Sequence, residues 1–291
     1  MERTVETQKK RSMALEIWRR LRKNKMAMLG LVILVMLALT AIFADVIADY
    51  DTKVIAQDIK NRLQGPSMEH WCGTDEFGRD IFARLVHGSR VSLVVGLISV
   101  SISLLMGGAL GAIAGYYGGR VDNVIMRIMD IFLAVPSILL AMTIVAALGT
   151  SLINVMLAIG VSGIPGYARI VRASVMSIKD QEFVEASRAI GAKSPTTIFR
   201  EILPNCLAPI IVQATLSVAG AILSTASLSF IGLGVQPPSP EWGAMLSTGR
   251  RYIRTEPYLT VIPGLAIMVV VYALNVVGDG LRDCLDPRLK K

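Results

Sequence analysis

The sequence has 291 residues, of which 53% are apolar, and its mean hydropathy is +0.56. These values exclude an ordinary soluble protein and indicate a membrane protein with several spanning segments. The formal net charge of +8 is concentrated near the start of the chain, with nine Lys/Arg in residues 1–25, which is typical of membrane orientation and not of nucleic-acid binding. Three distant cysteines and two histidines fit neither a disulfide framework nor a metal site.

Residues 1–25 predict a basic amphipathic tail on the cytoplasmic side of a membrane. Leu15, Trp18 and Leu21 share one face of a helix, which is typical of a segment lying on anionic lipid. Residues 26–48 predict the first transmembrane helix. This apolar run is longer than that of a signal peptide and lacks a clear cleavage site, so we expect an uncleaved anchor.

Residues 49–88 predict a polar extracytoplasmic segment that contains the sequence HWCGTDEFGRD. Such a cluster could suggest a metal or catalytic site, but His70 has no partner at metal-ligand spacing, which favours a solvated scaffold turned by glycines. The role of the single thiol of Cys72 stays open. Arg79 to Arg90 is expected to form an amphipathic helix that leads into the next span.

Residues 89–280 predict five further spans, at about 91–117, 124–148, 152–170, 207–230 and 259–279, followed by a cytoplasmic C-terminus over 281–291. The expected fold is therefore all-α, with six transmembrane helices and both termini in the cytoplasm. Proline interrupts the third, fourth and sixth spans, at Pro136, Pro165 and Pro263, and predicts kinks there.

Small residues and charges give two further expectations for these spans. Gly107, Gly111 and Gly115 are four residues apart, so they share one helix face and predict a packing seam. Trp242, in a proline-rich second outer loop over 232–258, is expected to anchor at the membrane interface. With this topology 21 of the 30 Lys/Arg lie inside and nine outside, in agreement with the positive-inside rule.

The segment 180–204, between the fourth and fifth spans, predicts a rigid helical protrusion into the cytoplasm. Asp180 is expected to cap a helix whose apolar residues Phe183, Ala186 and Ile190 share one side. Gly191 is expected to end that helix, because glycine reaches the left-handed conformation cheaply. Ser194-Pro195 then predicts the cap and first residue of a second short helix that ends at Pro204.

This protrusion resembles the Glu-Ala-Ala loop of permease subunits of ATP-binding-cassette importers. The matching residues are Glu185, Ala186, Gly191, Leu203 and Pro204. Ser187 replaces the second alanine and is nearly isosteric with it. Glu201 stands where isoleucine is usual, with Ile202 next to it, which shifts the apolar register of the second helix by one residue. The resemblance implies that the segment is a coupling helix bound by a separate ATPase, through Phe183, Glu185, Ala186, Ser187, Ala189, Ile190, Gly191, Leu203 and Pro204.

The resemblance extends over nearly the whole chain, through GTD-x-x-GRD, GYYGG-x-x-D, SLSFIGLG, QPP-x-PEWG and GDGLRD-x-LDP. Together these are similar to the C-type permease subunit of dipeptide and oligopeptide importers, whose near relatives carry nickel or glutathione. It implies a homologous permease as heterodimer partner, two cytoplasmic ATPases that bind ATP and Mg, and an extracytoplasmic binding protein. This chain then needs no cofactor of its own and lies in a bacterial or archaeal cytoplasmic membrane. The implied docking residues are Gly73, Thr74, Asp75, Gly78, Arg79, Asp80 and Trp242.

The second and fifth predicted spans, and residues 259–277 of the sixth, carry no Asp, Glu, Lys, Arg or His, which argues against an ion-coupled carrier. The sequence also lacks G-x-x-x-x-G-K-[ST], H-E-x-x-H and G-x-S-x-G, so we expect a non-enzymatic subunit driven by a partner's ATP hydrolysis. Di- or oligopeptide import is the expected function, with nickel or glutathione import as the alternative. A channel or carrier, and a membrane scaffold without transport, are the other classes. The sequence assigns neither the substrate nor the residues of the pathway.

Overall fold

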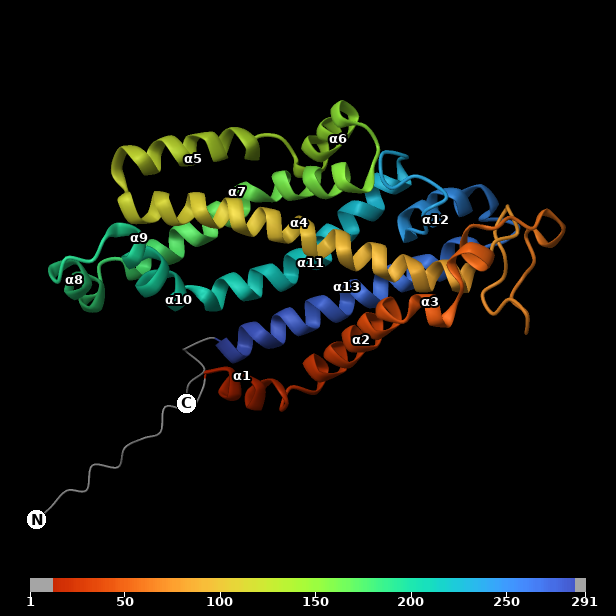
Figure 1. Cartoon of the computed structure of the whole chain (residues 1–291), viewed down its shortest axis with the longest axis horizontal. Coiled ribbons are helices and arrows are strands. Elements are labelled where there is room, and N and C mark those ends of the chain that lie inside the picture. Colours follow the sequence, from red (N-terminus) through yellow and green to blue (C-terminus); the bar gives the residue numbers. More distant parts are fainter. Residues whose placement is uncertain (1–12, 286–291) are drawn as a thin grey trace, which may run out of the picture.

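The computed structural model describes residues 13–285. The first part of the predicted basic tail, before Met13, and the residues after Leu285 lie outside the described part. Within that part every regular element is helical, apart from one isolated bridge between Thr74 and Asp80. The chain is therefore an all-α protein. The helices run side by side along the long axis of the molecule (Figure 1).

Five helices are long and apolar enough to cross a membrane. They are α2 (Lys25–Ile42), α4 (Ile81–Tyr117), α7 (Leu152–Ile178), α11 (Leu207–Phe230) and α13 (Tyr258–Leu285). Two shorter helices, α5 (Gly119–Leu133) and α6 (Ser137–Leu148), are together long and apolar enough for a sixth candidate crossing, but they are bent by 83° relative to each other.

The bend between α5 and α6 corrects the expectation of one kinked span over 124–148. Residues 134–136 leave the helix, and Pro136 has the extended ψ of 131° at the start of α6. Proline lacks an N–H and disfavours helical backbone at the residue before it, so the chain turns here and starts a new helix. Pro165 and Pro263, in contrast, lie inside the uninterrupted helices α7 and α13.

The shorter elements gather at the two ends of the bundle (Figure 1). One end, which we call the knuckle end, holds α1 (Met13–Leu21), α8 (Glu182–Ala189), α9 (Ser194–Thr196), η3 (Thr197–Ile202) and α10 (Leu203–Asn205). The opposite end, the loop end, holds α3 (Ala44–Ile47), η1 (Tyr50–Ile55), η2 (Ile59–Asn61), α12 (Trp242–Gly249) and η4 (Arg250–Tyr252). Long apolar helices thus separate two polar ends.

Glycines bring α4 and α7 into backbone contact. A Cβ added at Gly107 or Gly115 would approach the backbone of α7 more closely than real Cβ atoms do, and one at Gly111 would meet the carbonyl oxygen of Ala168. Two serines add hydrogen bonds along the same seam, because Ser99 Oγ donates to Met156 O at 3.1 Å and Ser103 Oγ donates to Gly160 O at 2.6 Å. These two helices therefore form a tightly packed pair at the centre of the fold.

Trp242 lies in the core, which corrects its expected place at the membrane interface. Its side chain is only 2% exposed, and its indole Nε1 donates to Leu85 O of α4 at 3.1 Å. The indole fits because Gly88 leaves room for it. Burial satisfies both the apolar ring and its single donor, so Trp242 fastens α12 to the outer part of α4.

Two helices extend beyond the predicted spans. α4 begins directly at Ile81, so the expected amphipathic lead-in and the second span form one continuous helix. α13 continues past the predicted end at residue 279 and reaches Leu285. At the start of the bundle, α2 ends at Ile42 and the remainder of the predicted first span forms the short helix α3.

Candidate functional site

The predicted protrusion corresponds to residues 180–205, which we call the knuckle. Its first helix begins one residue later than the sequence predicts. Asp180 belongs to the turn that ends α7, and Gln181 takes the cap position of α8 without a side-chain hydrogen bond. Asp180 therefore does not cap the helix. Gly191 follows the last turn of α8 with a φ of +85°, a backbone conformation that glycine adopts without strain.

Helix α8 has one attached face and one exposed face. Val184 and Ser187 are buried against the rest of the chain, with exposed fractions of 0% and 9%. Phe183 is 38% exposed and Ile190 is 87% exposed. Glu185, Ala186 and Ala189 are also exposed. Of the implied coupling residues on α8, all but Ser187 thus lie on the surface, and the apolar ones among them have little cover from this chain.

The second half of the knuckle does not end at Pro204. The turns of α9, η3 and α10 follow one another from Ser194 to Asn205, and the chain continues through Cys206 into α11. Lys193, and not Ser194, takes the cap position. Leu203 is half-buried and Pro204 is exposed. Proline is tolerated in the first turn of a helix, so it marks the start of α10 and not a stop.

Glu201 lies in η3, a π-helix, which fits more residues into a turn than an α-helix does. The buried residues Ile198, Ile202, Cys206 and Ile210 follow one another at intervals of four in this part of the chain. Ile202 is 0% exposed, while Glu201 lies at the edge of the buried cluster.

A separate hydrophobic cluster fastens the knuckle to the bundle. Val184, Ile198 and Ile202 pack with residues from the knuckle ends of three long helices, namely Ala112, Val171, Val175 and Ile210. The Arg188 guanidinium also lies over the ring of Tyr116, 4.9 Å from its centroid. Helix α8 is therefore packed against α4, α7 and α11 together.

Two ion pairs hold α5 against α7 near the knuckle. Arg172 donates to both carboxylate oxygens of Asp122, and its Nη2 lies 2.6 Å from Oδ2. Arg169 Nη2 donates to Asp130 Oδ1 at 2.8 Å. The first pair is bidentate and largely buried, so it contributes geometric precision as well as attraction. These contacts attach α5 to the end of α7 that carries the knuckle.

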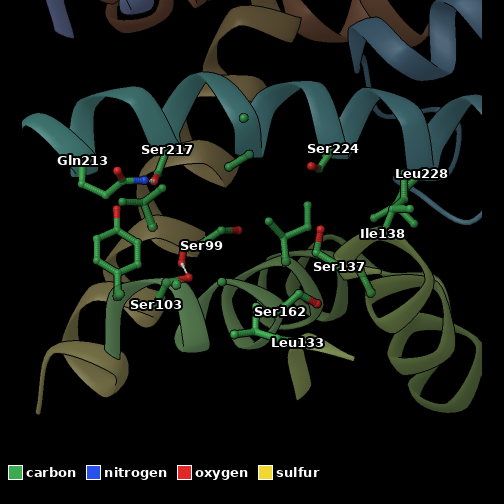
Figure 2. A pocket seen from close by; sticks show the side chains of 18 residues that line it. Ser99, Ser103, Leu133, Ser137, Ile138, Ser162, Gln213, Ser217, Ser224 and Leu228 are labelled. Atoms are coloured by element: carbon green, nitrogen blue, oxygen red, sulfur yellow. Dashed lines mark hydrogen bonds between the residues drawn. The ribbon is translucent and has the colours of Figure 1, made fainter. Parts of the chain in front are cut away.

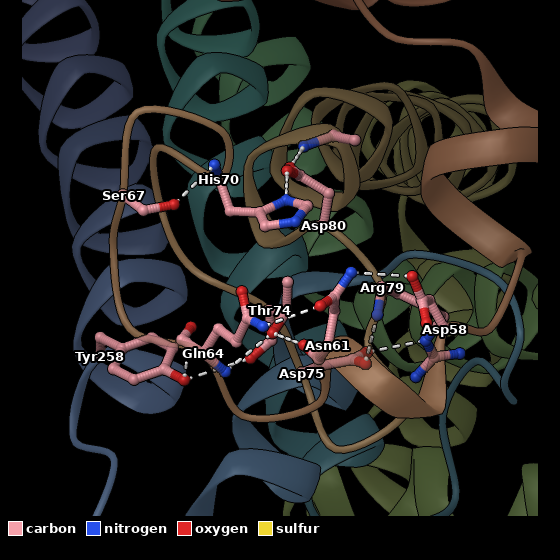
Figure 3. A network of polar contacts seen from close by, with 11 residues as sticks. Asp58, Asn61, Gln64, Ser67, His70, Thr74, Asp75, Arg79, Asp80 and Tyr258 are labelled. Carbon is pink, nitrogen blue, oxygen red and sulfur yellow. Dashed lines mark hydrogen bonds and ion pairs between the residues drawn. The ribbon is translucent and has the colours of Figure 1, made fainter.

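At the loop end, residues 58–80 are folded around a polar network (Figure 3). The carboxylate of Asp75 accepts hydrogen bonds from the backbone N–H groups of Phe77 and Arg79, and from Arg79 Nε at 2.7 Å. Thr74 Oγ1 donates to Asn61 O and accepts from Gln64 N. Hydrogen bonds between side chains and backbone of this segment therefore hold its turns in place.

Asp80 connects this network to the start of α4. It caps the helix by accepting from Ala83 N at 2.8 Å, and its second oxygen lies 2.8 Å from His70 Nδ1 (Figure 3). Tyr258, at the start of α13, donates to Gln64 O at 3.0 Å. The loop end is therefore tied to the first turns of two long helices. Within residues 13–285, no three His, Cys, Asp or Glu side chains are grouped in a way that could hold a metal ion.

The implied docking residues at the loop end lie mostly below its surface. Thr74, Asp75 and Arg79 are 0%, 8% and 5% exposed, so their side chains shape the segment and do not present themselves to a partner. Gly73 and Gly78 are there because the turns need φ values of +79° and +76°. The exposed apolar side chains of this region include Met68 and Trp71.

Burial raises the pKa of titratable groups at the loop end, Cys72 and Glu241 among them. Burial, together with the nearby carboxylate of Asp80, raises the pKa of the Cys72 thiol, which keeps it protonated and poorly nucleophilic. Burial also raises the pKa of Glu241, which is 1% exposed and accepts from Gly243 N at 2.9 Å and Ala244 N at 2.7 Å. Glu241 thus caps α12 from inside the protein.

A cavity of about 340 Å³ is lined by residues of α4, α5, α6, α7 and α11 (Figure 2). Its lining combines apolar side chains with uncharged polar ones, and none of the described residues that line it is charged. Gln213, Ser217 and Ser224 line it from α11, and Ser99 and Ser103 from α4 (Figure 2). Sequence reasoning missed this site. Its signal was the recurrence of polar residues at intervals of four and seven within apolar helices.

Comparison with protein families identifies two matching regions. Residues 107–291 match the family described as binding-protein-dependent transport system inner membrane component. Residues 12–66 match the N-terminal transmembrane domain of oligopeptide transport permease C.

Three curated proteins are similar over nearly the whole chain. The dipeptide transport system permease protein DppC of Alkalihalophilus pseudofirmus is 52% identical over 94% of this chain and 90% of its own length. The di/tripeptide transport system permease protein DppC of Pseudomonas aeruginosa is 48% identical over 94% and 92%. The glutathione transport system permease protein GsiD of Escherichia coli is 45% identical over 94% and 90%.

Among solved structures, a chain of the MetNI methionine ABC transporter in an inward-facing conformation has the same fold. Its TM-score is 0.57 at 20% identity, and the match covers 71% of this chain and 98% of that chain. A likeness at this identity concerns the arrangement of the helices.

Proposed function

The chain belongs to the family of binding-protein-dependent transport system inner membrane components, the permeases of ATP-binding-cassette importers, and we propose that it forms half of the pathway of an importer of di- and oligopeptides. It is a multi-pass protein of the inner membrane, and a permease is a non-enzymatic component of such a transporter. Peptide is the favoured substrate because two relatives at 52% and 48% identity are named as peptide permeases.

The observation that supports this function best is the construction of the knuckle. Its apolar face around Ile190 is exposed, while its opposite face around Val184 is fastened to the ends of α4, α7 and α11. An apolar helix face without cover is typical of a surface that packs into a groove of another protein. The partner in this proposal is one of two ATPases that bind ATP and Mg and supply the energy.

In this mechanism ATP binding moves the ATPases, and α8 moves with the groove in which it sits. The packed cluster around Ile202 carries the displacement to three long helices and, through the Asp122–Arg172 pair, to α5. Packed helices switch between discrete arrangements, so the pathway changes from opening on one side to opening on the other. A homologous permease completes the pathway, and a binding protein delivers substrate at the loop end.

Uptake of labelled substrates by cells that lack only this subunit tests the proposed function. Loss of dipeptide and tripeptide uptake, restored by the wild-type gene, is the expected result. Nickel and glutathione uptake are measured in the same cells, the second because a relative at 45% identity is named as a glutathione permease. Loss of glutathione or nickel uptake with normal peptide uptake would contradict the assignment to peptides while keeping the architecture.

A further inference from the structure

The polar groups that line the central cavity fall into two classes. Three serines already use their hydroxyl protons within the helices: Ser99 donates to Met156 O, Ser103 to Gly160 O and Ser162 to Ala158 O, at 3.1, 2.6 and 2.7 Å. The first two bonds join α4 to α7, and the third lies within α7. The other class has hydrogen-bonding capacity that the described residues do not use.

Tyr167 is the clearest member of the second class. Its side chain is 4% exposed and lines the cavity, yet its hydroxyl makes no hydrogen bond to any described residue. Ser217 Oγ lies near this hydroxyl but is not in hydrogen-bonding geometry with it, and it accepts from Gln213 Nε2 at 3.1 Å. An unpaired buried hydroxyl is destabilising, so such groups are rare in native proteins unless something else pairs with them.

From this arrangement, and resting on the proposed function, we propose that Tyr167, Gln213 and Ser217 form a subsite within the membrane that binds the backbone amide group of a passing peptide. The phenol and the serine hydroxyl each donate and accept, and the carboxamide does both, so together they match the C=O and N–H of an amide. The cavity is large enough for a small ligand, at about 340 Å³ from this chain alone.

The chemistry of the lining also defines what the subsite ignores. None of the described residues that line the cavity is charged, so no ion pair selects an acidic or a basic side chain there. Hydrogen bonds to the backbone are common to all peptides, whereas their side chains differ. The subsite therefore recognises the peptide class and tolerates many sequences, which suits a permease whose cargo arrives already chosen by a binding protein.

The test uses the complete transporter, with its partner permease, ATPases and binding protein, reconstituted in proteoliposomes. Uptake of a labelled dipeptide is measured at saturating, loaded binding protein, together with the rate of ATP hydrolysis. Tyr167→Phe removes only the hydroxyl, and Ser217→Ala is a second variant. Tyr272→Phe, at a 47% exposed position of α13 outside the cavity, is the matched control.

We expect Tyr167→Phe and Ser217→Ala to lower dipeptide uptake about two- to tenfold, the value of one hydrogen bond, with the ATPase rate unchanged. The ester analogue of the dipeptide, which lacks the amide N–H, should be affected less by both variants. Uptake equal to that of the Tyr272→Phe control in both variants would overturn the subsite while leaving peptide import intact. Failure of the wild-type transporter to move any dipeptide would instead overturn the proposed function.

Discussion

At the scale of single residues, the α4–α7 contact depends on positions that have no side chain. Gly111 lies against the backbone of Ala168, which cannot move aside, whereas Gly108, one turn away, has only side-chain atoms at 3.9 Å. The two glycines are on the same helix and differ in what surrounds them. They therefore form a matched pair.

We predict that Gly111→Ala destabilises the permease by about 1–3 kcal/mol, because the added methyl group forces the two helices apart. Gly108→Ala should be neutral or slightly stabilising, since alanine favours helix more than glycine does. Thermal unfolding of the purified protein in detergent measures both. Equal stability of the two variants would show that α4 and α7 do not pack as closely as described.

Residue type alone did not reveal which side chains are buried. The sequence correctly indicates that Gly191 ends a helix, because a left-handed turn is a local property of the backbone. The sequence wrongly suggested that Trp242 and Asp75 are exposed. Asp75 is buried by hydrogen bonds to nearby residues, and Trp242 by contacts with residues far away in the sequence. The indole of Trp242 meets Leu85 across 157 positions of sequence, and Tyr258 reaches Gln64 across 194. Such contacts follow from the fold and not from a motif.

At the scale of elements, the knuckle has to be both attached and accessible. Its buried side uses Val184 and Ile202, which are 0% exposed, and its exposed side uses Ile190, which is 87% exposed. Substitutions on the two sides should therefore fail differently. A change on the buried side weakens the protein, and one on the exposed side weakens the contact with a partner.

We predict that Ile190→Asp reduces ATP-driven uptake at least tenfold with no loss of thermal stability, because the charge must enter an apolar groove of the ATPase while this chain loses no packing. Ile253→Asp, at a 59% exposed position of the loop end, is the control for co-purification of the ATPases, which should not depend on that end. Co-purification of the ATPases and peptide uptake are the measurements. Normal uptake by Ile190→Asp would mean that the ATPase engages another surface.

Helix boundaries were predictable where the apolar stretch is long. They were unpredictable at prolines, which either end a helix or lie within it. The fifth predicted span, 207–230, coincides with α11. Proline marked three positions in the same way, yet α7 and α13 continue through Pro165 and Pro263, whereas the chain turns by 83° around Pro136. Packing decides between these outcomes, since Pro165 and Pro263 are buried among neighbouring helices and Pro136 is exposed. The central cavity was missed for a similar reason, because its lining comes from five separate helices.

At the scale of the whole molecule, the two polar ends of the bundle are on opposite sides of the apolar helices (Figure 1). The distribution of Lys/Arg predicts that the knuckle lies in the cytoplasm. We predict that a cysteine at position 190 is labelled by an impermeant maleimide only from the cytoplasmic side, and one at position 68 only from outside.

For this labelling experiment the three natural cysteines are first replaced, and right-side-out and inverted vesicles are compared. Ile190 and Met68 are suitable positions because they are 87% and 95% exposed. Labelling of both positions from the same side, or each from the side opposite to that expected, would contradict the proposed orientation and with it the placement of the ATPase.

Helix α4 runs without interruption from the cap at Asp80 to the ring of Tyr116 beneath Arg188. At 1.5 Å per residue its 37 residues extend roughly 55 Å, well beyond the ~30 Å of a bilayer's hydrocarbon core. One rigid body therefore belongs to both polar ends. By thermodynamic reciprocity, any nucleotide state that alters how tightly the loop end holds its binding protein must itself be favoured or disfavoured by that protein to the same degree. The affinity of the loop end for the binding protein and the affinity of the ATPases for nucleotide are then thermodynamically linked.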